Sequence, residues 1–302
     1  MNPILEVRHL TKSFGSHKAV DDLSFSVIPG DVYGFLGENG AGKSTTLRTV
    51  LGLIRPSSGE VYIGGEPFPQ AGRRLLRRVG AVVERPDLYG YLSGRENLRL
   101  FADLCDPAIP GKRLDEVLEL VGLSGRDKDR VKGYSLGMKQ RLGIAVALVH
   151  DPDLLILDEP TNGLDPQGIA DMRELIRHLS RDRSKTVVVS SHLLHEIEQV
   201  ATRLLILHKG KKVVEGPMEE LFHPDETTVV VDITPDSLVA DAVKASSWNA
   251  SLKEDATDNT LRFTLHPDRI PELTSWLVAN GAAVRGIRAR HSLEDLFLSL
   301  TP

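Results

Sequence analysis

One eight-residue segment constrains the fold of this chain more than any other feature. Residues 37–44 read Gly-Glu-Asn-Gly-Ala-Gly-Lys-Ser and fit the pattern G-x-x-x-x-G-K-[ST]. The segment follows a short apolar run at 32–36 and precedes residues 44–54, whose apolar spacing is helical. A glycine-rich loop between a strand and a helix turns successive backbone N–H groups inward and forms an anion cradle. The sequence therefore predicts a phosphate-binding loop within an α/β fold.

The side chains of this loop have separate expected tasks. We expect the Lys43 ammonium group to lie against the β- and γ-phosphates of a nucleoside triphosphate, and Ser44 Oγ to be a ligand of Mg²⁺. The predicted nucleotide-binding positions of the loop are Gly37, Glu38, Asn39, Gly40, Ala41, Gly42, Lys43, Ser44 and Thr45. A glycine-rich turn without a ligand is the alternative, and the strand–loop–helix context argues against it.

A pair of carboxylates forms the second candidate site. Residues 154–160 read Leu-Leu-Ile-Leu-Asp-Glu-Pro, so a buried apolar strand delivers Asp158 to its C-terminal edge. In an open parallel sheet, that edge is where ligands bind. Asp158 suits a Mg²⁺ ion held through water, and Glu159 suits the general base that polarises the attacking water. Two solvated carboxylates at a strand end are the alternative, and the phosphate loop on the same chain favours the metal site.

The first 220 residues alternate strand-like and helix-like patterns. Continuous apolar runs at 79–83, 154–157 and 186–189 indicate strands that are buried on both faces. Amphipathic patterns such as those at 93–104 and 113–121 indicate helices between the strands. Strands separated by helices predict parallel pairing, so we expect an α/β domain with a parallel-sheet core.

The last quarter of the chain differs in charge. Residues 221–302 hold 7 Lys+Arg and 12 Asp+Glu, which accounts for the whole net charge of −5. Pro224 lies in a polar stretch typical of a linker. We therefore expect one domain at 1–222 and an accessory domain at 223–302.

The accessory domain is expected to be small and α+β. Its predicted elements are a strand at 227–233, a helix at 236–245, a weak strand at 248–253, a strand at 261–265, a helix at 271–280, a strand at 284–289 and a last helix at 292–300. This order resembles the split β-α-β-β-α-β arrangement of ferredoxin-like domains. Its role stays open between a small-molecule sensor, a dimer clamp and a packing appendage.

Composition and apolar patterning exclude several classes of protein. The chain has one cysteine, Cys105, so it is not a disulfide scaffold. Its longest apolar run, Ile144 to Val149, is far shorter than the roughly 18 residues that a membrane-spanning helix needs. The N-terminus lacks the pattern of a signal peptide, and we expect a cytoplasmic protein. The mildly acidic balance gives no reason to expect nucleic acid as a partner.

Taken in order, these motifs resemble the ATP-binding cassette superfamily over residues 4 to about 220. The most specific segment is Tyr-Ser-Leu-Gly-Met-Lys-Gln-Arg-Leu at 134–142, which is similar to the cassette signature, commonly Leu-Ser-Gly-Gly-Gln. Residues 162–165, Asn-Gly-Leu-Asp, resemble the D-loop, and residues 190–192, Ser-Ser-His, resemble the switch-histidine segment. Phe14 stands where the family has an aromatic residue that stacks on adenine.

The resemblance implies a fold and a mechanism. The fold is a P-loop NTPase cassette with a parallel-sheet core and a helical subdomain at about 85–148. Two cassettes face each other head to tail, so that Ser135 and the Gly137 N–H of one contact the γ-phosphate bound by the other. His192 would hold the γ-phosphate and the attacking water, although a lone histidine after a strand is more often a surface residue. ATP joins the dimer and hydrolysis releases it.

Two departures from the common motifs are typical of a subfamily. Glu84 stands where most cassettes have a Gln that offers a neutral carbonyl to Mg²⁺, and its charge would strengthen the metal contact or shift protonation. Leu136 and Met138 replace a Gly and a Gln of the signature, and Leu136 narrows the approach to the phosphate. With Gly-Arg-Glu-Asn-Leu at 94–98 and Ser-Leu-Glu-Asp-Leu-Phe-Leu-Ser-Leu at 292–300, these features resemble the cassette subunits of bacterial exporters of the bacitracin-resistance and lantibiotic-immunity type.

The sequence as a whole favours an ATPase subunit that energises a membrane exporter of drugs, antibiotic peptides or lipids. The resemblance implies ATP and Mg²⁺ as cofactors, a homodimer of cassettes, and an integral-membrane permease docked by residues 84–101. Such a subunit is peripheral at the inner face of the cell membrane. The alternative is a soluble cassette ATPase that remodels ribosomes or nucleic-acid complexes. Three features argue against this alternative: the chain has one cassette, no heptad repeat and no excess of basic residues. The signature segment argues against a metabolic P-loop kinase.

Overall fold

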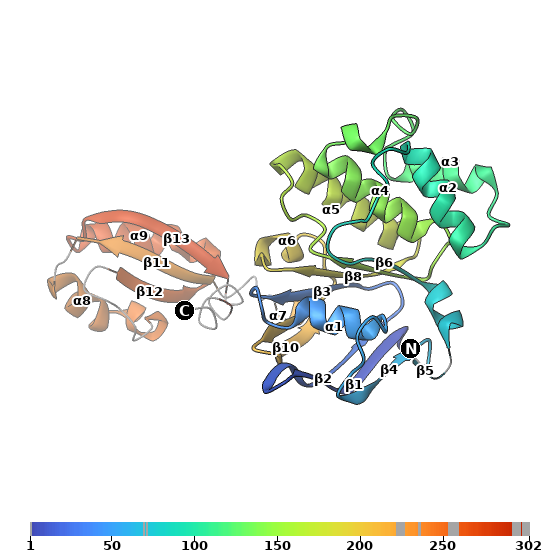
Figure 1. Ribbon diagram of the computed structural model, residues 1–302. Coiled ribbons are helices and arrows are strands. Elements are labelled where there is room, and N and C mark those ends of the chain that lie inside the picture. The colour runs from blue at the N-terminus through green and yellow to red at the C-terminus, as the bar shows by residue number, and fades with distance from the viewer. Residues whose placement is uncertain are drawn as a thin grey trace. The chain divides into compact units, whose positions relative to one another are not determined.

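The chain divides into two compact units, Met1–Pro217 and Met218–Pro302. This computed structural model describes residues 2–68, 70, 72–221, 227–234, 237–252, 260–291 and 297. The division falls a few residues before the boundary expected at 222 and 223. Figure 1 shows the elements of each unit.

The larger sheet of the first unit is built from strands that are buried on both faces. Its order is β10-β9-β3-β8-β7-β6. The strands are β3 Val32–Gly37, β6 Val79–Val82, β7 Leu154–Asp158, β8 Thr186–Ser191, β9 Arg203–His208 and β10 Lys211–Pro217. All neighbours pair in parallel except β10, which is antiparallel to β9 at one edge. Every residue of β3, β7 and β8 is buried, which confirms the expected parallel core.

A second, antiparallel sheet lies on the other side of the first helix. It consists of β1 Leu5–Phe14, β2 His17–Val27, β4 Ser58–Ile63 and β5 Glu66–Phe68, in the order β2-β1-β4-β5. The sequence patterns did not predict these strands, because irregularities in the β1–β2 pairing break the simple alternation of buried and exposed residues. Helix α1, Lys43–Val50, lies between the two sheets (Figure 1), and its Leu47 and Val50 join the core that both sheets share.

The remaining helices of the first unit form two groups. The helical lobe consists of α2 Gly94–Cys105, α3 Gly111–Leu120 and α4 Leu136–Leu148, which contact one another within the expected subdomain (Figure 1). Helices α5 Pro166–Arg181 and α6 Leu194–Glu198 pack against the larger sheet. Short 3₁₀ helices occupy Arg73–Arg78 and Val131–Gly133. In the described part of the chain, no helix has both the length and the apolar character needed to cross a bilayer.

Within the described residues, the second unit has a three-stranded antiparallel sheet with helices. Its elements are α7 Met218–Leu221, β11 Thr227–Ile233, α8 Ser237–Lys244, a 3₁₀ helix at Ser247–Ser251, β12 Thr260–Leu265, a 3₁₀ helix at Pro267–Arg269, α9 Ile270–Ala279 and β13 Val284–His291. The central strand β11 pairs with β12 on one side and β13 on the other. Side chains of β11, α8 and α9 contribute to the core of this unit.

One predicted strand of the second unit is wrong. Residues 247–251 form a 3₁₀ helix rather than the expected weak strand, and Ser246 Oγ begins it by accepting a hydrogen bond from the Trp248 N–H. The indole of Trp248 is buried in the core, which a solvent-facing edge strand would not achieve. Leu252 keeps a single bridge to Phe263. The last helix predicted at 292–300 falls almost entirely outside the described residues.

Candidate functional site

The predicted phosphate loop connects β3 to α1 at the C-terminal edge of the larger sheet. Gly42 has a φ of 106°, and a Cβ atom there would lie 2.4 Å from the carbonyl oxygen of Ala19 in β2. The Gly210 N–H donates to the Ala41 carbonyl at 2.9 Å, and the Asp21 N–H donates to the Gly210 carbonyl at 2.9 Å. The loop is therefore held against both β2 and the turn between β9 and β10.

Several backbone N–H groups of this loop are available to a ligand. Among the described residues, none accepts a hydrogen bond from the N–H groups of Gly40, Gly42, Lys43 or Ser44. These groups precede or begin α1, whose first turn carries no acidic side chain. Free donors at a helix N-terminus form an anion site.

Lys43 is nearly buried and is held over the loop. Only 5% of its side chain is exposed, and Nζ donates to the Gly37 carbonyl at 2.6 Å and to the Glu38 carbonyl at 3.2 Å. Nζ also lies 3.2 Å from Glu159 Oε1. The ammonium group thus stands between the phosphate loop and the predicted general base.

The end of β7 presents one buried carboxylate oxygen without a protein partner. Ser190 Oγ donates to Asp158 Oδ1 at 2.6 Å and accepts from the Glu159 N–H at 2.9 Å. Among the described residues, Asp158 Oδ2 has no hydrogen-bond partner although it is buried. A buried oxygen with a full negative charge is costly unless a cation or a donor reaches it.

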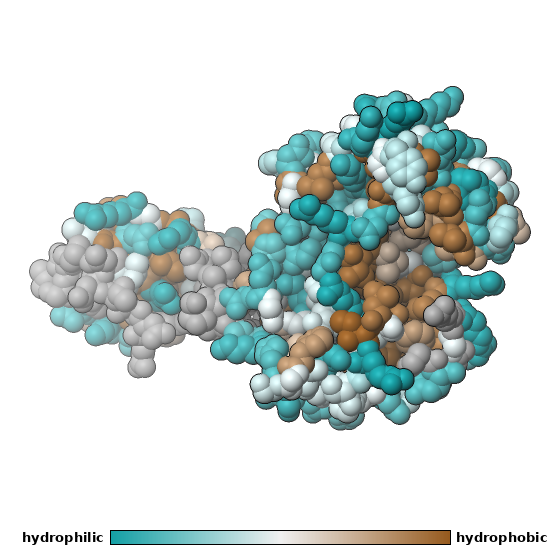
Figure 2. Space-filling model, viewed as in Figure 1, coloured by the Kyte–Doolittle hydropathy of each residue, from teal (hydrophilic) through white to brown (hydrophobic). Residues whose placement is uncertain are grey.

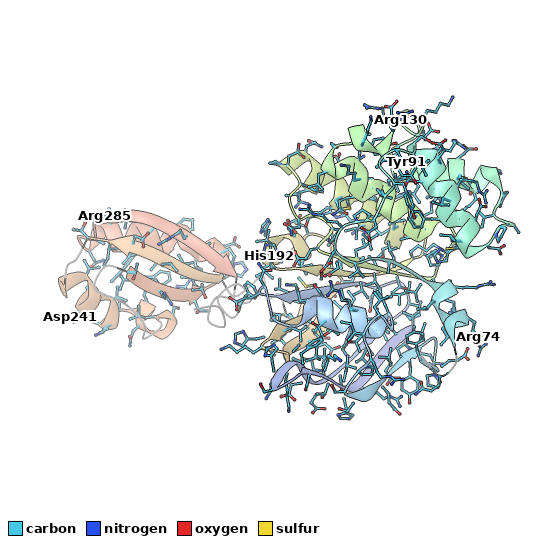
Figure 3. All side chains as sticks on the ribbon, viewed as in Figure 1. Arg74, Tyr91, Arg130, His192, Asp241 and Arg285 are labelled. Atoms are coloured by element: carbon cyan, nitrogen blue, oxygen red, sulfur yellow. The ribbon has the colours of Figure 1, made fainter. Side chains whose placement is uncertain are left out.

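Glu159 is fixed from both sides. Its Oε2 lies 2.8 Å from His192 Nδ1, and its Oε1 faces Lys43. Glu159 also has a positive φ of 50°, an uncommon conformation for a residue with a side chain. Figure 3 labels His192, which directly follows β8. The predicted catalytic residues Glu159, His192 and Lys43 therefore form one connected group.

The predicted metal-binding residues line one cavity of about 230 Å³. Ser44, Glu84 and Asp158 all contribute to it, together with Glu159. An orphaned carboxylate oxygen, a hydroxyl group and further carboxylates are the oxygen ligands that Mg²⁺ prefers, so these residues fit the ion. The Glu84 carboxylate itself is paired with the Arg48 guanidinium.

The signature residues lie apart from the phosphate loop of the same chain. Ser135 caps α4 by accepting a hydrogen bond from the Met138 N–H at 3.2 Å. Ser135 and Gly137 line a separate hollow of about 460 Å³ with D-loop residues including Leu164 and Asp165. Leu136 contributes to both hollows, and its side chain is directed toward Gly163. Ser135 and Gly137 thus line the hollow that lacks Ser44, while Leu136 and Gly163 line both hollows.

Phe14 ends β1 and is half exposed, with the Lys12 ammonium 4.8 Å from the centre of its ring. It pairs in register with His17, two residues before Ala19, which contacts the phosphate loop. The aromatic ring is thus on the hairpin that supports the loop, and half of its surface remains available for stacking.

Two residues of the site were missed by sequence reasoning. Arg48 follows Ser44 by four residues, a spacing that places both on one helix face and could have been noticed. Glu196 is buried and accepts hydrogen bonds from Thr161 Oγ1 at 2.5 Å and Ser191 Oγ at 3.0 Å. It links Thr161, the residue before the D-loop, to the switch segment, and no pattern in the sequence singled it out.

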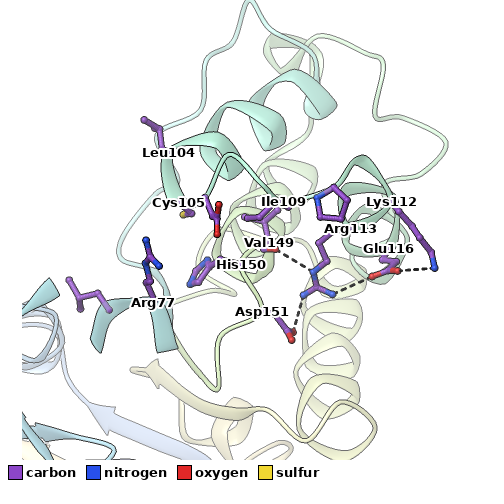
Figure 4. A pocket seen from close by; sticks show the side chains of 13 residues that line it. Arg77, Leu104, Cys105, Ile109, Lys112, Arg113, Glu116, Val149, His150 and Asp151 are labelled. Carbon is purple, nitrogen blue, oxygen red and sulfur yellow. Dashed lines mark hydrogen bonds and ion pairs between the residues drawn. The ribbon is translucent and has the colours of Figure 1, made fainter. Parts of the chain in front are cut away.

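A larger cavity, of about 790 Å³, contains none of the predicted ATP-site residues. It is lined by residues of α2, α3 and the segment after α4, among them Leu104, Ile109, Val149 and His150 (Figure 4). Burial lowers the pKa of His150, whose Nε2 lies 3.2 Å from the Val79 carbonyl oxygen.

Figure 2 shows apolar side chains gathered in a hollow between the helical lobe and the sheets. Exposed apolar side chains of the first unit include Leu53, Tyr89, Tyr91, Leu100 and Leu104.

The fold and the geometry around Glu159 define a P-loop ATPase. Comparison with known proteins specifies its family. A family model described as ABC transporter matches residues 20–162. The bacitracin transport ATP-binding protein BcrA of Bacillus licheniformis is 44% identical over 302 residues, which cover 99% of this chain and 98% of that protein. The lantibiotic transport ATP-binding protein SrtF of Streptococcus pyogenes is 38% identical, over 73% of this chain and 96% of that protein.

A solved structure gives the same result. A dimeric post-hydrolysis form of the ATP-binding cassette MJ0796, bound to ADP and phosphate, has a TM-score of 0.64 and 25% identity over 71% of this chain and 99% of that chain. The chain belongs to the ATP-binding cassette family and is an ATP-binding, ATP-hydrolysing subunit of a transporter. The expected resemblance is confirmed, and the alternative of ribosome or nucleic-acid remodelling is not favoured.

Proposed function

We propose that this chain energises the export of antibiotic peptides of the bacitracin or lantibiotic kind by hydrolysing MgATP. The position of Glu159 carries the hydrolytic part, because its carboxylate lies between Lys43 and His192 beside the phosphate loop. Similarity to a bacitracin transport subunit along nearly the whole chain supports the class of substrate.

The site residues would divide the work of hydrolysis. The free N–H groups of residues 37–45 and the Lys43 ammonium bind the phosphates, and Phe14 stacks on the adenine. Ser44 and Asp158 hold Mg²⁺, which neutralises phosphate charge when bound. The triphosphate draws Lys43 away from Glu159, and Glu159 then accepts a proton from the attacking water while His192 keeps the carboxylate oriented.

The site is completed by a second copy of the chain. Ser135 and Gly137 lie at the N-terminus of α4, where the helix dipole and free N–H groups favour a γ-phosphate. Because they line a hollow separate from the phosphate loop of their own chain, the partner's nucleotide is their ligand. The solved dimeric cassette offers a precedent for such an assembly.

The membrane path belongs to a separate permease. Residues 84–101 comprise the link that follows β6 and the first turns of α2. Exposed Tyr89, Tyr91 and Leu100 in this segment provide apolar contact area for a partner, and Figure 3 labels Tyr91. The cavity beside Leu104 extends this surface (Figure 4). We therefore place the chain at the cytoplasmic face of the cell membrane, docked by this segment.

The substitution Glu159→Gln tests the hydrolytic role. It keeps the shape and hydrogen-bonding reach of the side chain but removes its basicity, so ATP turnover is expected to fall by about 10²- to 10⁴-fold. Binding of a fluorescent ATP analogue is expected to persist. The matched control is Glu174→Gln on the exposed face of α5, which should leave turnover unchanged. Normal turnover in Glu159→Gln would contradict the assignment.

A susceptibility assay tests the transport role. The chain is expressed together with a candidate permease in bacteria that are sensitive to bacitracin. We expect protection that disappears with Glu159→Gln. Protection that survives this substitution would argue against ATP-driven export.

A further inference from the structure

Arg48 and Glu84 form an ion pair beside the proposed metal site. Arg48 lies on α1, one helical turn after Ser44, and its guanidinium donates to Glu84 Oε1. Glu84 follows β6 and lines the same cavity as Ser44 and Asp158. The pair therefore joins the helix of the phosphate loop to the strand next to the one that carries Asp158.

The charges around this cavity make an additional free carboxylate unfavourable. Glu84, Asp158 and Glu159 all line it, and the Lys43 ammonium is already paired with Glu159. A bound triphosphate adds several more negative charges. A neutral Gln at position 84 would add none, whereas an unpaired Glu84 would repel the nucleotide across a short distance.

The backbone also directs Glu84. Its φ of 61° lies in the left-handed region, which a residue with a side chain adopts only at a cost. The side chain is about two-thirds exposed, so the Arg48 guanidinium rather than a surrounding core fixes its direction.

We propose that Arg48 is a positioning residue that cancels the charge of Glu84. The Arg48–Glu84 pair then acts as a neutral hydrogen-bonding group where most cassettes have a Gln. This inference rests on the proposed MgATP site. It explains how a carboxylate is tolerated next to Asp158 without weakening nucleotide binding.

A set of three variants tests the proposal. Equilibrium binding of a fluorescent ATP analogue with Mg²⁺ is measured for Arg48→Gln, Glu84→Gln and the double variant. We expect affinity about five-fold weaker in Arg48→Gln, because Glu84 is left uncompensated. Glu84→Gln should bind the analogue more tightly than the natural protein, because the Arg48 charge is then left free to attract the phosphates. The double variant should return to within about two-fold of the natural affinity.

Two controls separate a charge effect from a structural one. Arg48→Lys keeps the charge and should restore most of the affinity. Arg78 directly precedes β6, at the end of the strand away from Glu84, and its Nε lies 2.9 Å from Asp153 Oδ2 in an ion pair. Arg78→Gln removes this pair and should leave nucleotide affinity unchanged. Thermal unfolding should change little in any of these variants, because exposed ion pairs contribute little to stability.

Three results would be decisive against the inference. Unchanged affinity in Arg48→Gln would show that Glu84 needs no compensation. Equal weakness in Arg48→Gln and the double variant would show that Arg48 acts on the nucleotide directly. Strong weakening in Arg78→Gln would show a general effect of surface charge. Failure of the natural protein to bind the analogue would instead overturn the proposed site, a separate outcome.

Discussion

Two independent features of Gly42 restrict which residue the chain can accept at this position. Its φ of 106° is strained for any residue with a Cβ atom, and the Ala19 carbonyl oxygen occupies the space where that atom would be placed. Neither restriction involves charge. A substitution at this position therefore disturbs the backbone path of the phosphate loop, although Lys43 itself is unchanged.

Gly42→Ala is expected to weaken ATP binding at least about ten-fold and to lower the free energy of unfolding by about 1–3 kcal/mol. The cause is displacement of the loop N–H groups from their ligand. Isothermal titration with MgATP measures the affinity, and denaturant unfolding measures the stability. The control is Gly125→Ala, because nothing lies within 4 Å of a Cβ atom there and its φ is not positive. Natural affinity in Gly42→Ala would refute the role of loop geometry.

Motif spacing identified the site residues better than it identified their partners. Lys43 was predicted from its loop motif, Asp158 and Glu159 from the strand end together with that loop, and His192 from the family resemblance. That Glu159 would lie between Lys43 and His192 depends on three strands meeting at one sheet edge, which no local pattern contains. The Arg48 contact depends likewise on packing between α1 and the end of β6.

At the scale of elements, α2 carries much of the proposed docking surface and begins with a capping box. Ser93 Oγ accepts a hydrogen bond from the Glu96 N–H at 3.2 Å, and the Glu96 carboxylate accepts one from the Ser93 N–H at 2.7 Å. The latter bond lowers the pKa of Glu96. Together the two bonds satisfy donors that a helix start otherwise leaves open.

Ser93→Ala is expected to lower the free energy of unfolding by about 1 kcal/mol, because the Glu96 N–H loses its acceptor. Nucleotide binding should not change, since α2 lies outside the phosphate site. Denaturant unfolding followed by circular dichroism measures the loss. The exposed Ser124, replaced by Ala, serves as the reference and should be close to neutral. An equal loss in both variants would rule out a capping effect.

Regular patterns predicted the parallel strands, and irregular ones concealed other elements. Strands β3, β7 and β8 are short, apolar and buried throughout, so sequence alone indicates them. The antiparallel strands β1 and β2 contain register shifts that interrupt alternation. The prediction of a weak strand at 248–253 failed for another reason. Burial of Trp248 in the core overrides the local β preference of this segment, which forms a 3₁₀ helix at 247–251.

At the scale of the whole molecule, the proposed role of Ser135 makes function depend on the assembly of two copies of the chain. Ser135 is at the N-terminus of a helix and lines a hollow of its own, with the D-loop. Under this proposal a monomer binds ATP but lacks one side of the complete site. ATP binding and dimerisation are expected to be coupled, each favouring the other.

Ser135→Arg tests this coupling in a Glu159→Gln background, where ATP is not consumed. The bulky side chain should block the approach of the second nucleotide, so light scattering with ATP should show monomers instead of dimers. ATP affinity measured at low protein concentration should stay within about three-fold of the parent. Ser124→Arg, at an exposed serine outside this hollow, shows whether any added arginine has this effect. Persistent ATP-dependent dimers with Ser135→Arg would contradict a role for this residue in the interface.

Gly210 occupies the turn between β9 and β10, hydrogen-bonded to Ala41 on one side and to Asp21 on the other. A random-mutagenesis screen for lost nucleotide binding should accordingly recover changes at this hairpin, although it contains no recognised motif. A variant that loses nucleotide binding through such a change would keep every hallmark residue intact. Functional forecasts that inspect only the hallmarks would misclassify it.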